Sequence, residues 1–249
     1  MSTSNASQLA QRYVSDELTH FVGSALPSEE AQFRLLLKIL GEGLLLRSPD
    51  LTGVEAGRQS SEGFEVSIDP TKPLSENEQF LASVVCFCDI PVEDMAIHMR
   101  HFSRFGIAFK KRFLLELGAS PVFYVAREAS TAPPDEEAHR AQLFDQRFEG
   151  FHEIFSVYRE QLPEHRSSTR RVQVFLSKYV FAFMKFFDAS ADVDDRRNHY
   201  MEREWRILGN VRFDLTDVRR IIVPEKYGGR LREEVPEYIG QISFAPEMP

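Results

Sequence analysis

Short apolar runs alternate with helix-spaced apolar stripes along most of the chain. Short runs rich in β-branched and aromatic residues are typical of strands, whereas apolar residues three and four apart indicate helices. The order of these patterns predicts an α+β fold with a mixed, twisted sheet. We expect its strands at residues 18–22, 64–68, 84–88, 105–109, 121–126, 200–207, 219–224 and 242–244.

The clearest helix pattern follows the first strand. Ser28 precedes it as a candidate N-cap, and Gly43 follows it as a candidate C-terminal stop. The spacing predicts that one face of this helix packs on the sheet. That face carries Phe33, Leu36, Leu37 and Leu40.

A second helical pattern covers residues 135–188. Phenylalanine-rich stripes with steps of three and four residues run from Phe144 to Leu162 and again from Val172 to Phe187, with Pro163 between them. We therefore expect a two-helix insertion at about residues 135–188, within a single α+β domain that spans residues 1–249.

The stretch 200–207 holds the only tryptophan of the chain and four charged residues. Read as a strand, it places Glu202, Glu204 and Arg206 on one face. The other face then carries mostly core-type residues. Two interpretations remain open, because the polar face is either simply solvated at a sheet edge or forms a site. The opposite face holds Met201, Arg203, Trp205 and Ile207.

Composition narrows the class of protein. The formal net charge of −8 disfavours nucleic acid and anionic membranes as partners. The most apolar run, residues 172–187, contains two lysines and is shorter than the roughly 20 residues that a membrane span requires. We find no secretory signal. The two cysteines, Cys86 and Cys88, are expected to be reduced, which favours a cytoplasmic protein.

Other polar residues have both structural and functional interpretations. His20, on the first strand, is either a hydrogen-bonded structural histidine or a ligand-binding one. Asp89 precedes a helix that Pro91 is expected to initiate, and we expect Asp89 to cap that helix. His98 and His101 share a helix face, but no carboxylate motif accompanies them, so we predict no metal site. Arg206 either binds a phosphate or pairs with its neighbouring glutamates.

The chain contains the blocks Phe-Cys-Asp-Ile-Pro at 87–91 and Glu-Arg-Glu-Trp-Arg at 202–206. With several less specific blocks, their order over residues 15–225 resembles the AbiGi-type abortive-infection family of bacterial phage-resistance proteins. The resemblance implies a role in phage defence or in a toxin–antitoxin pair, with a protein partner encoded by an adjacent gene. Members of this family are usually labelled antitoxins. Further blocks lie at residues 20–22, 43–44, 105–110 and 121–124.

The chain places a histidine on its first strand, then a helix that ends in a Gly-Leu turn, a middle strand, and a late strand with a Glu-x-Glu pair. This order is distantly similar to ADP-ribosyltransferase folds. That similarity implies that His20 helps to hold NAD, that Glu204 binds the nicotinamide ribose and that Glu202 positions the acceptor. Arg206 and Tyr124 would complete the NAD site, by binding phosphate and by stacking. A carboxylate there would stabilise the positive charge that develops on the ribose. The chain departs from this pattern because its middle strand has no Ser-Thr-Ser block.

These resemblances leave two hypotheses. In one, the protein is an NAD-dependent ADP-ribosyltransferase or glycohydrolase, with NAD as its substrate and no metal. In the other, it is a non-catalytic antitoxin or regulatory module that binds a partner protein.

Overall fold

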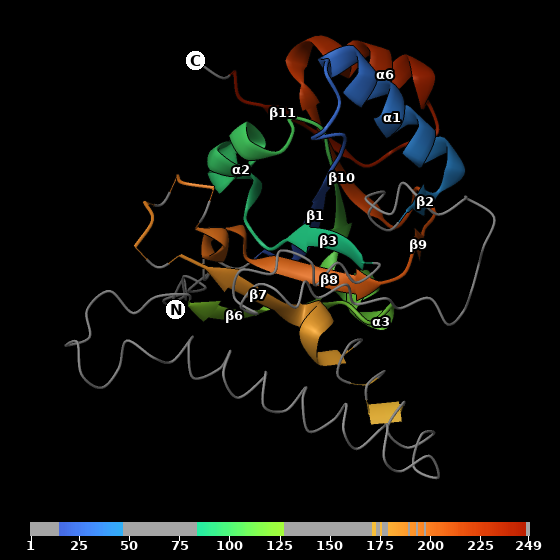
Figure 1. Cartoon of the computed structure of the whole chain (residues 1–249). Helices are drawn as coiled ribbons and strands as arrows, with labels where there is room; N and C mark the ends of the chain where they lie inside the picture. The colour runs from blue at the N-terminus through green and yellow to red at the C-terminus, as the bar shows by residue number, and fades with distance from the viewer. Residues whose placement is uncertain are drawn as a thin grey trace, which may run out of the picture.

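The computed structural model describes residues 15–46, 84–126 and 198–247, together with 171–172, 175, 179–188, 190–192 and 194–196. Within these residues the fold is α+β with a mixed sheet, as predicted (Figure 1). The strand order in the seven-stranded sheet of this described part is β11-β10-β4-β1-β3-β8-β5. All neighbours are antiparallel except β10 and β11, which are parallel.

The sheet strands come from the beginning, the middle and the end of the described chain. The centre holds β1 (Glu17–Phe21), β3 (Val84–Cys88) and β4 (Gly106–Lys110). One side ends with β10 (Val218–Pro224) and β11 (Gln241–Ala245), and the other with β8 (Glu204–Leu208) and β5 (Ser120–Pro121). Two short pairs lie outside this sheet: β2 (Leu44–Leu45) pairs with β9 (Val211–Arg212), and β6 (Phe123–Ala126) pairs with β7 (Met184–Phe187).

The main core fills one face of the sheet. Helix α1 (Glu29–Glu42) buries Phe33, Leu36 and Leu40 there, which confirms the predicted stripe. Ser28 caps its first turn by accepting a hydrogen bond from the Ala31 N–H (3.2 Å). Helices α3 (Lys111–Glu116) and α6 (Gly228–Glu234) add Leu114 and Leu231 to the same core.

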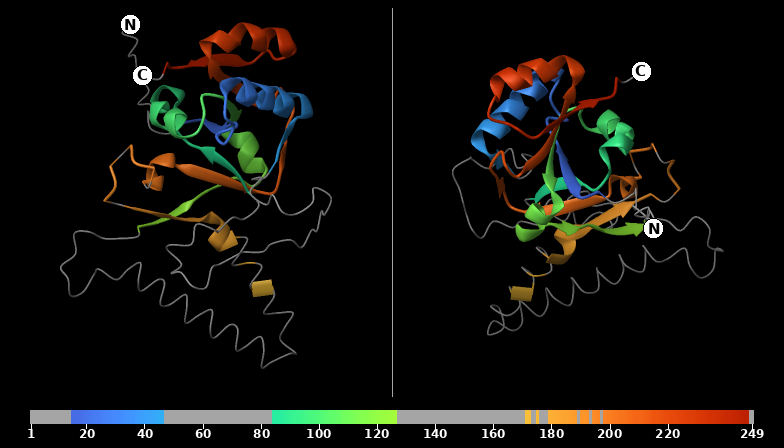
Figure 2. Two further views of the ribbon diagram at one scale, coloured as in Figure 1. Left: turned by 45° about the horizontal axis from the view of Figure 1, so that its top comes forward. Right: turned by 180° about the vertical axis from the view of Figure 1, so that it is seen from behind.

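The opposite face of the sheet has two separate covers. Helix α2 (Ala96–His101), which follows the 3₁₀ turn η2 (Val92–Asp94), buries Met99 against Cys88 and Ile222. The β6–β7 pair lies beside β8, further along the same face. Figure 2 shows α1 and α6 on one side of the sheet and α2 on the other. Turn η7 (Glu225–Tyr227) leads from β10 into α6.

Two expectations about the elements need correction, and two others are not tested. Residues 184–187 form strand β7 after the 3₁₀ turn η5 (Phe181–Phe183), so the second predicted helix is wrong at its C-terminal end. The run 121–126 is two strands in different sheets, because Val122 turns between them and donates its N–H to the Glu204 carbonyl oxygen (2.9 Å). The first predicted helix of the insertion and the strand at 64–68 lie outside the described residues.

Candidate functional site

The acidic stretch is not one continuous strand. Residues His199–Glu202 form the 3₁₀ turn η6, and β8 begins only at Glu204. Between them, Arg203 has φ 45°, the one positive φ of a non-glycine residue in the described part of the chain. This left-handed residue breaks the predicted alternation. Glu202 therefore does not share a strand face with Glu204 by periodicity, and Met201 is exposed rather than in the core.

Glu204 and Arg206 do share a face, as predicted, but that face is buried. The two residues are 5% and 8% exposed. Arg206 binds the carboxylate in a bidentate manner, with Nε 2.7 Å from Oε1 and Nη2 3.2 Å from Oε2. Strand β8 lies between β3 and β5. The interpretation of a simply solvated polar edge is therefore wrong for this pair.

Lys185 on β7 joins the two glutamates. Its Nζ lies 2.9 Å from Glu204 Oε2 and 2.6 Å from Glu202 Oε2. The other oxygen of Glu202 lies 2.9 Å from Nδ1 of His199. Glu202 and Glu204 thus meet through a shared cation rather than through the period of a strand. We call Lys185, Glu202, Glu204 and Arg206 the β7–β8 charge network.

Backbone hydrogen bonds complete the attachment of β6 and β7 to β8. Tyr124 on β6 accepts a hydrogen bond from the backbone N–H of Glu204 through its hydroxyl oxygen (2.7 Å). Arg206 Nη1 donates to the carbonyl oxygen of Ala182 (2.6 Å). Tyr124 and Lys185 are partners in the β6–β7 register, so both reach β8 from the same place. The network therefore fastens the small sheet to the large one.

The pKa values of the charge network show how strongly its members depend on one another. Burial alone would raise the pKa of Glu204, but Arg206 and Lys185 hold it well below its ordinary value. Burial alone would likewise lower the pKa of Lys185, but the two carboxylates raise it. The pKa of Glu202 is also lowered, since the contacts with His199 and Lys185 outweigh burial. Both glutamates and Lys185 are therefore charged at neutral pH.

His20 lies away from this network. The register pairs Thr19 with Cys88, and Cys88 with Glu204, so Thr19 is on the face of Glu204. His20 is on the other face, where its ring packs edge-on against Phe87 with centroids 5.9 Å apart. Its Nδ1 lies 2.8 Å from the Cys86 carbonyl oxygen. The structure thus brings four of the five predicted site residues together and separates His20 from them.

Asp89 does not cap a helix, contrary to our expectation. Both of its carboxylate oxygens lie 2.9 Å from Lys111 Nζ, and Oδ1 also accepts the N–H of Ser15 (3.2 Å). The ammonium group of Lys111 lies 5.3 Å from the ring centroid of Trp205. Asp89 therefore connects the first residues of the described chain to α3.

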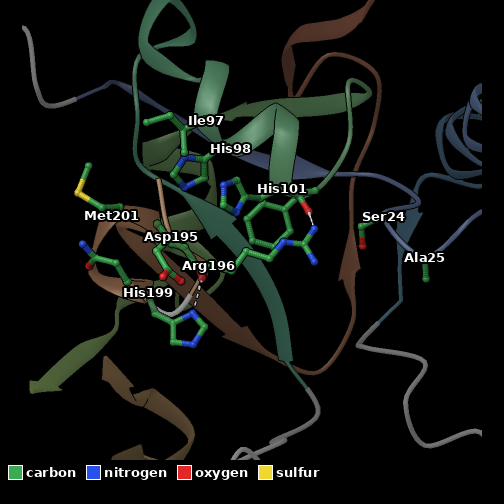
Figure 3. A pocket seen from close by; sticks show the side chains of 12 residues that line it. Ser24, Ala25, Ile97, His98, His101, Asp195, Arg196, His199 and Met201 are labelled. Carbon is green, nitrogen blue, oxygen red and sulfur yellow. Dashed lines mark hydrogen bonds and ion pairs between the residues drawn. The ribbon is translucent and has the colours of Figure 1, made fainter. Parts of the chain in front are cut away.

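A cavity of about 380 Å³ opens beside Glu202 and His199 (Figure 3). Its walls come from the turn after β1, from α2 and from residues 195–202. His98 and His101, the predicted histidine pair, both line it. Among the described residues, no group of three or more His, Cys, Asp or Glu side chains is placed to hold a metal ion.

Sequence reasoning missed Lys185 and this cavity. Lys185 stands in the run Met-Lys-Phe-Phe, where Met184 and Phe186 are buried and Lys185 is only partly so. That alternation of period two is typical of a strand. It could have indicated that Lys185 points away from the core side of β7.

The fold and the network define an α+β protein in which a buried cluster of charges joins two sheets. A family model described as "Putative abortive phage resistance protein AbiGi, antitoxin" matches residues 74–232. The match covers more than half of the chain, which therefore belongs to the AbiGi family. The blocks at residues 20–22 and 43–44 precede the matched range.

The other comparisons give no relative. No curated protein and no solved structure matches the chain. Within the part of the chain that the structure describes, no helix combines the length and apolar character needed to cross a bilayer. The similarity to ADP-ribosyltransferases, and the NAD site that it implies, stay predictions.

Proposed function

We propose that this AbiGi-family protein is the antitoxin member of a two-gene abortive-infection system and acts by binding a protein partner. The description of the family as an antitoxin supports this role in phage defence. One observation favours binding over catalysis: both carboxylate oxygens of Glu204 are already held, Oε1 by Arg206 and Oε2 by Arg206 and Lys185.

A catalytic carboxylate must contact the reacting sugar in the transition state. Glu204 is 5% exposed, and its carboxylate contacts the side chains of Arg206, Lys185 and Cys86. To contact a ribose, it would have to give up contacts that stabilise its charge. A buried carboxylate that loses its cation carries a large desolvation cost. The geometry around Glu204 therefore supports a structural role.

The test is to express the protein alone, the adjacent gene product alone, and the two together. We expect the protein alone to leave growth unaffected, the neighbour alone to be toxic, and the pair to restore growth and to co-purify. Purified wild-type protein should release no nicotinamide from NAD. Toxicity of the protein on its own, together with NAD consumption, would overturn the proposal.

A second candidate function is NAD-dependent ADP-ribosyl transfer or NAD hydrolysis, with Glu204 and Glu202 as its carboxylates. It is favoured by the cavity beside Glu202, a partly exposed carboxylate placed to contact a bound ligand. Arg206 and Tyr124 would then position Glu204 rather than bind NAD directly, and His20 would have no direct part.

Nicotinamide release by wild-type protein and by Glu202→Gln tests this candidate. A true active site predicts turnover by the wild type and a loss of about two orders of magnitude or more in the variant. Because Glu202 is not on β8, the variant should stay folded, which thermal melting checks. Absence of turnover by the folded wild type leaves the antitoxin role.

A further inference from the structure

The cavity beside Glu202 combines an aromatic wall with a polar rim. We propose that it binds a nucleoside or nucleoside monophosphate, with the base stacked on Phe102 and the polar part bonded at the rim by Arg196. The inference stands on the geometry of the cavity and does not require the proposed function.

The rings of Phe102 and His98 line the cavity, and Phe21, which is not in its lining, packs against both of them. Phe21 and Phe102 have centroids 6.2 Å apart and planes at 14°, and Phe21 and His98 have centroids 6.3 Å apart and planes at 26°. Phe102 lines the cavity and is 37% exposed, so this ring is not fully covered by the protein. An aromatic ring of this kind supports stacking of any base, because every base has a π-face.

The rim of the cavity supplies a positively charged group, negatively charged groups and a neutral hydroxyl. Arg196 donates from Nη2 to the His101 carbonyl oxygen, which holds its guanidinium at the cavity. Asp195 and Glu202 add carboxylates, and Ser24 adds a hydroxyl. Figure 3 shows Arg196 and Ser24 as separate groups around the same opening. Such a mixture suits a base and a sugar better than a purely apolar ligand.

One buried nitrogen gives a second, independent indication. His98 is 5% exposed, and its Nε2 has no hydrogen-bond partner among the described residues. Buried polar atoms are nearly always bonded, so this nitrogen is a spare hydrogen-bonding group in a residue that lines the cavity.

Size limits the class of ligand. The volume of about 380 Å³ lies at the lower end of the range of about 300–1,000 Å³ for small-molecule sites. It accommodates one nucleoside rather than an extended dinucleotide. The cavity therefore holds either a free mononucleotide or one half of a dinucleotide such as NAD. The experiment distinguishes these two ligands.

The experiment is calorimetric titration of the full-length protein with the four ribonucleosides, their 5′-monophosphates, nicotinamide mononucleotide and NAD. We expect saturable 1:1 binding of at least one mononucleotide or nucleoside. Phe102→Leu, which keeps an apolar side chain but removes the stacking ring, should weaken that binding about tenfold or more. Arg196→Gln should weaken the monophosphate more than the corresponding nucleoside.

Arg112→Gln is the matched control, because Arg112 is 90% exposed in its side chain and lies on α3. It should bind as the wild type does.

Tighter binding of NAD than of every mononucleotide would indicate that the ligand is a dinucleotide, and the reverse would indicate a free nucleotide. The proposal is overturned if no probe binds the folded wild type, or if binding is unchanged in both cavity variants while they remain folded. The nicotinamide-release assay is a separate measurement. Binding without turnover would support the nucleoside site and would contradict only the proposed NAD-dependent activity.

Discussion

Arg206 and Glu204, two residues apart on strand β8, form a bidentate ion pair that is almost completely buried. An isolated charge at either position would be strongly unfavourable, whereas the pair satisfies both groups. The pair also makes contacts outside its own strand. Arg206 reaches the carbonyl oxygen of Ala182, and Glu204 reaches Lys185 on β7. The docking of the β6–β7 pair therefore depends on charge as well as on apolar contact.

Glu204→Gln should lower the free energy of unfolding by about 3–5 kcal/mol, because it leaves Arg206 and Lys185 buried with one carboxylate fewer. Urea denaturation followed by circular dichroism measures the change. Glu116→Gln is the matched control. It breaks an ion pair with Arg112 whose side chains are 66% and 90% exposed, so it should cost less than about 0.5 kcal/mol. Equal effects of the two substitutions would contradict a structural role for Glu204.

Lys185→Met should destabilise the protein because it leaves Glu202 and Glu204 without their shared cation. The like charges then oppose each other, and the pKa of Glu202 should rise. Glu202→Gln in the same chain removes one of the two charges and should restore part of the loss. The four proteins of this double-mutant cycle, compared by urea denaturation, should give a coupling free energy of about 0.5–3 kcal/mol between Lys185 and Glu202. Strictly additive effects would show that the 2.6 Å contact is energetically neutral.

The charge network should also make stability depend on pH in a definite direction. The folded-state pKa of Glu204 lies below its ordinary value of 4.5, so the unfolded chain binds a proton over a pH range where the folded chain does not. The stabilisation is therefore complete above about pH 4.5 and is lost as the pH falls toward the folded-state pKa. Glu202 acts in the same direction.

The difference in unfolding free energy between wild type and Glu204→Gln isolates this effect. It should be largest at pH 6–7 and shrink steadily between about pH 4.5 and pH 3, since a protonated glutamate resembles glutamine. Denaturant titrations at several pH values measure it. A difference that stays constant across this range would mean that folding does not lower the pKa of Glu204.

The sequence predicted a helix or strand correctly where the periodicity and the cap residues that define it lie within that one element. The stripe and cap residues of α1 are an example, because Ser28 and Phe33 act within a few residues of the sequence. The alternation of Glu204 and Arg206 on β8 is another. These predictions needed only the periods of helix and strand and the chemistry of helix ends.

Long-range register could not be predicted in the same way. Whether His20 faces Glu204 depends on the pairing of Thr19 with Cys88, and a shift of one residue would move His20 to the other face. The helical interpretation of residues 184–187 failed for a related reason. Their parallel partner is β6, some 60 positions earlier, and the periodicity of a phenylalanine-rich run does not reveal it. The left-handed backbone of Arg203 was not predictable either, because arginine does not favour a positive φ.

The junction after α1 offers a test with an internal control, because it contains two glycines in different environments. Gly43 ends the helix with φ 60°, and a Cβ there would lie 2.5 Å from the carbonyl oxygen of Phe213. Gly43→Ala should therefore cost about 1–3 kcal/mol for the left-handed backbone, and more if the contact with Phe213 cannot relax. Gly41 lies inside the helix, and a Cβ there would meet nothing within 4 Å. Gly41→Ala should instead stabilise the protein by about 0.5–1 kcal/mol, since alanine favours the helix. Thermal melting of the two variants beside the wild type should shift in opposite directions, and a shift of the same sign would contradict the assigned C-cap.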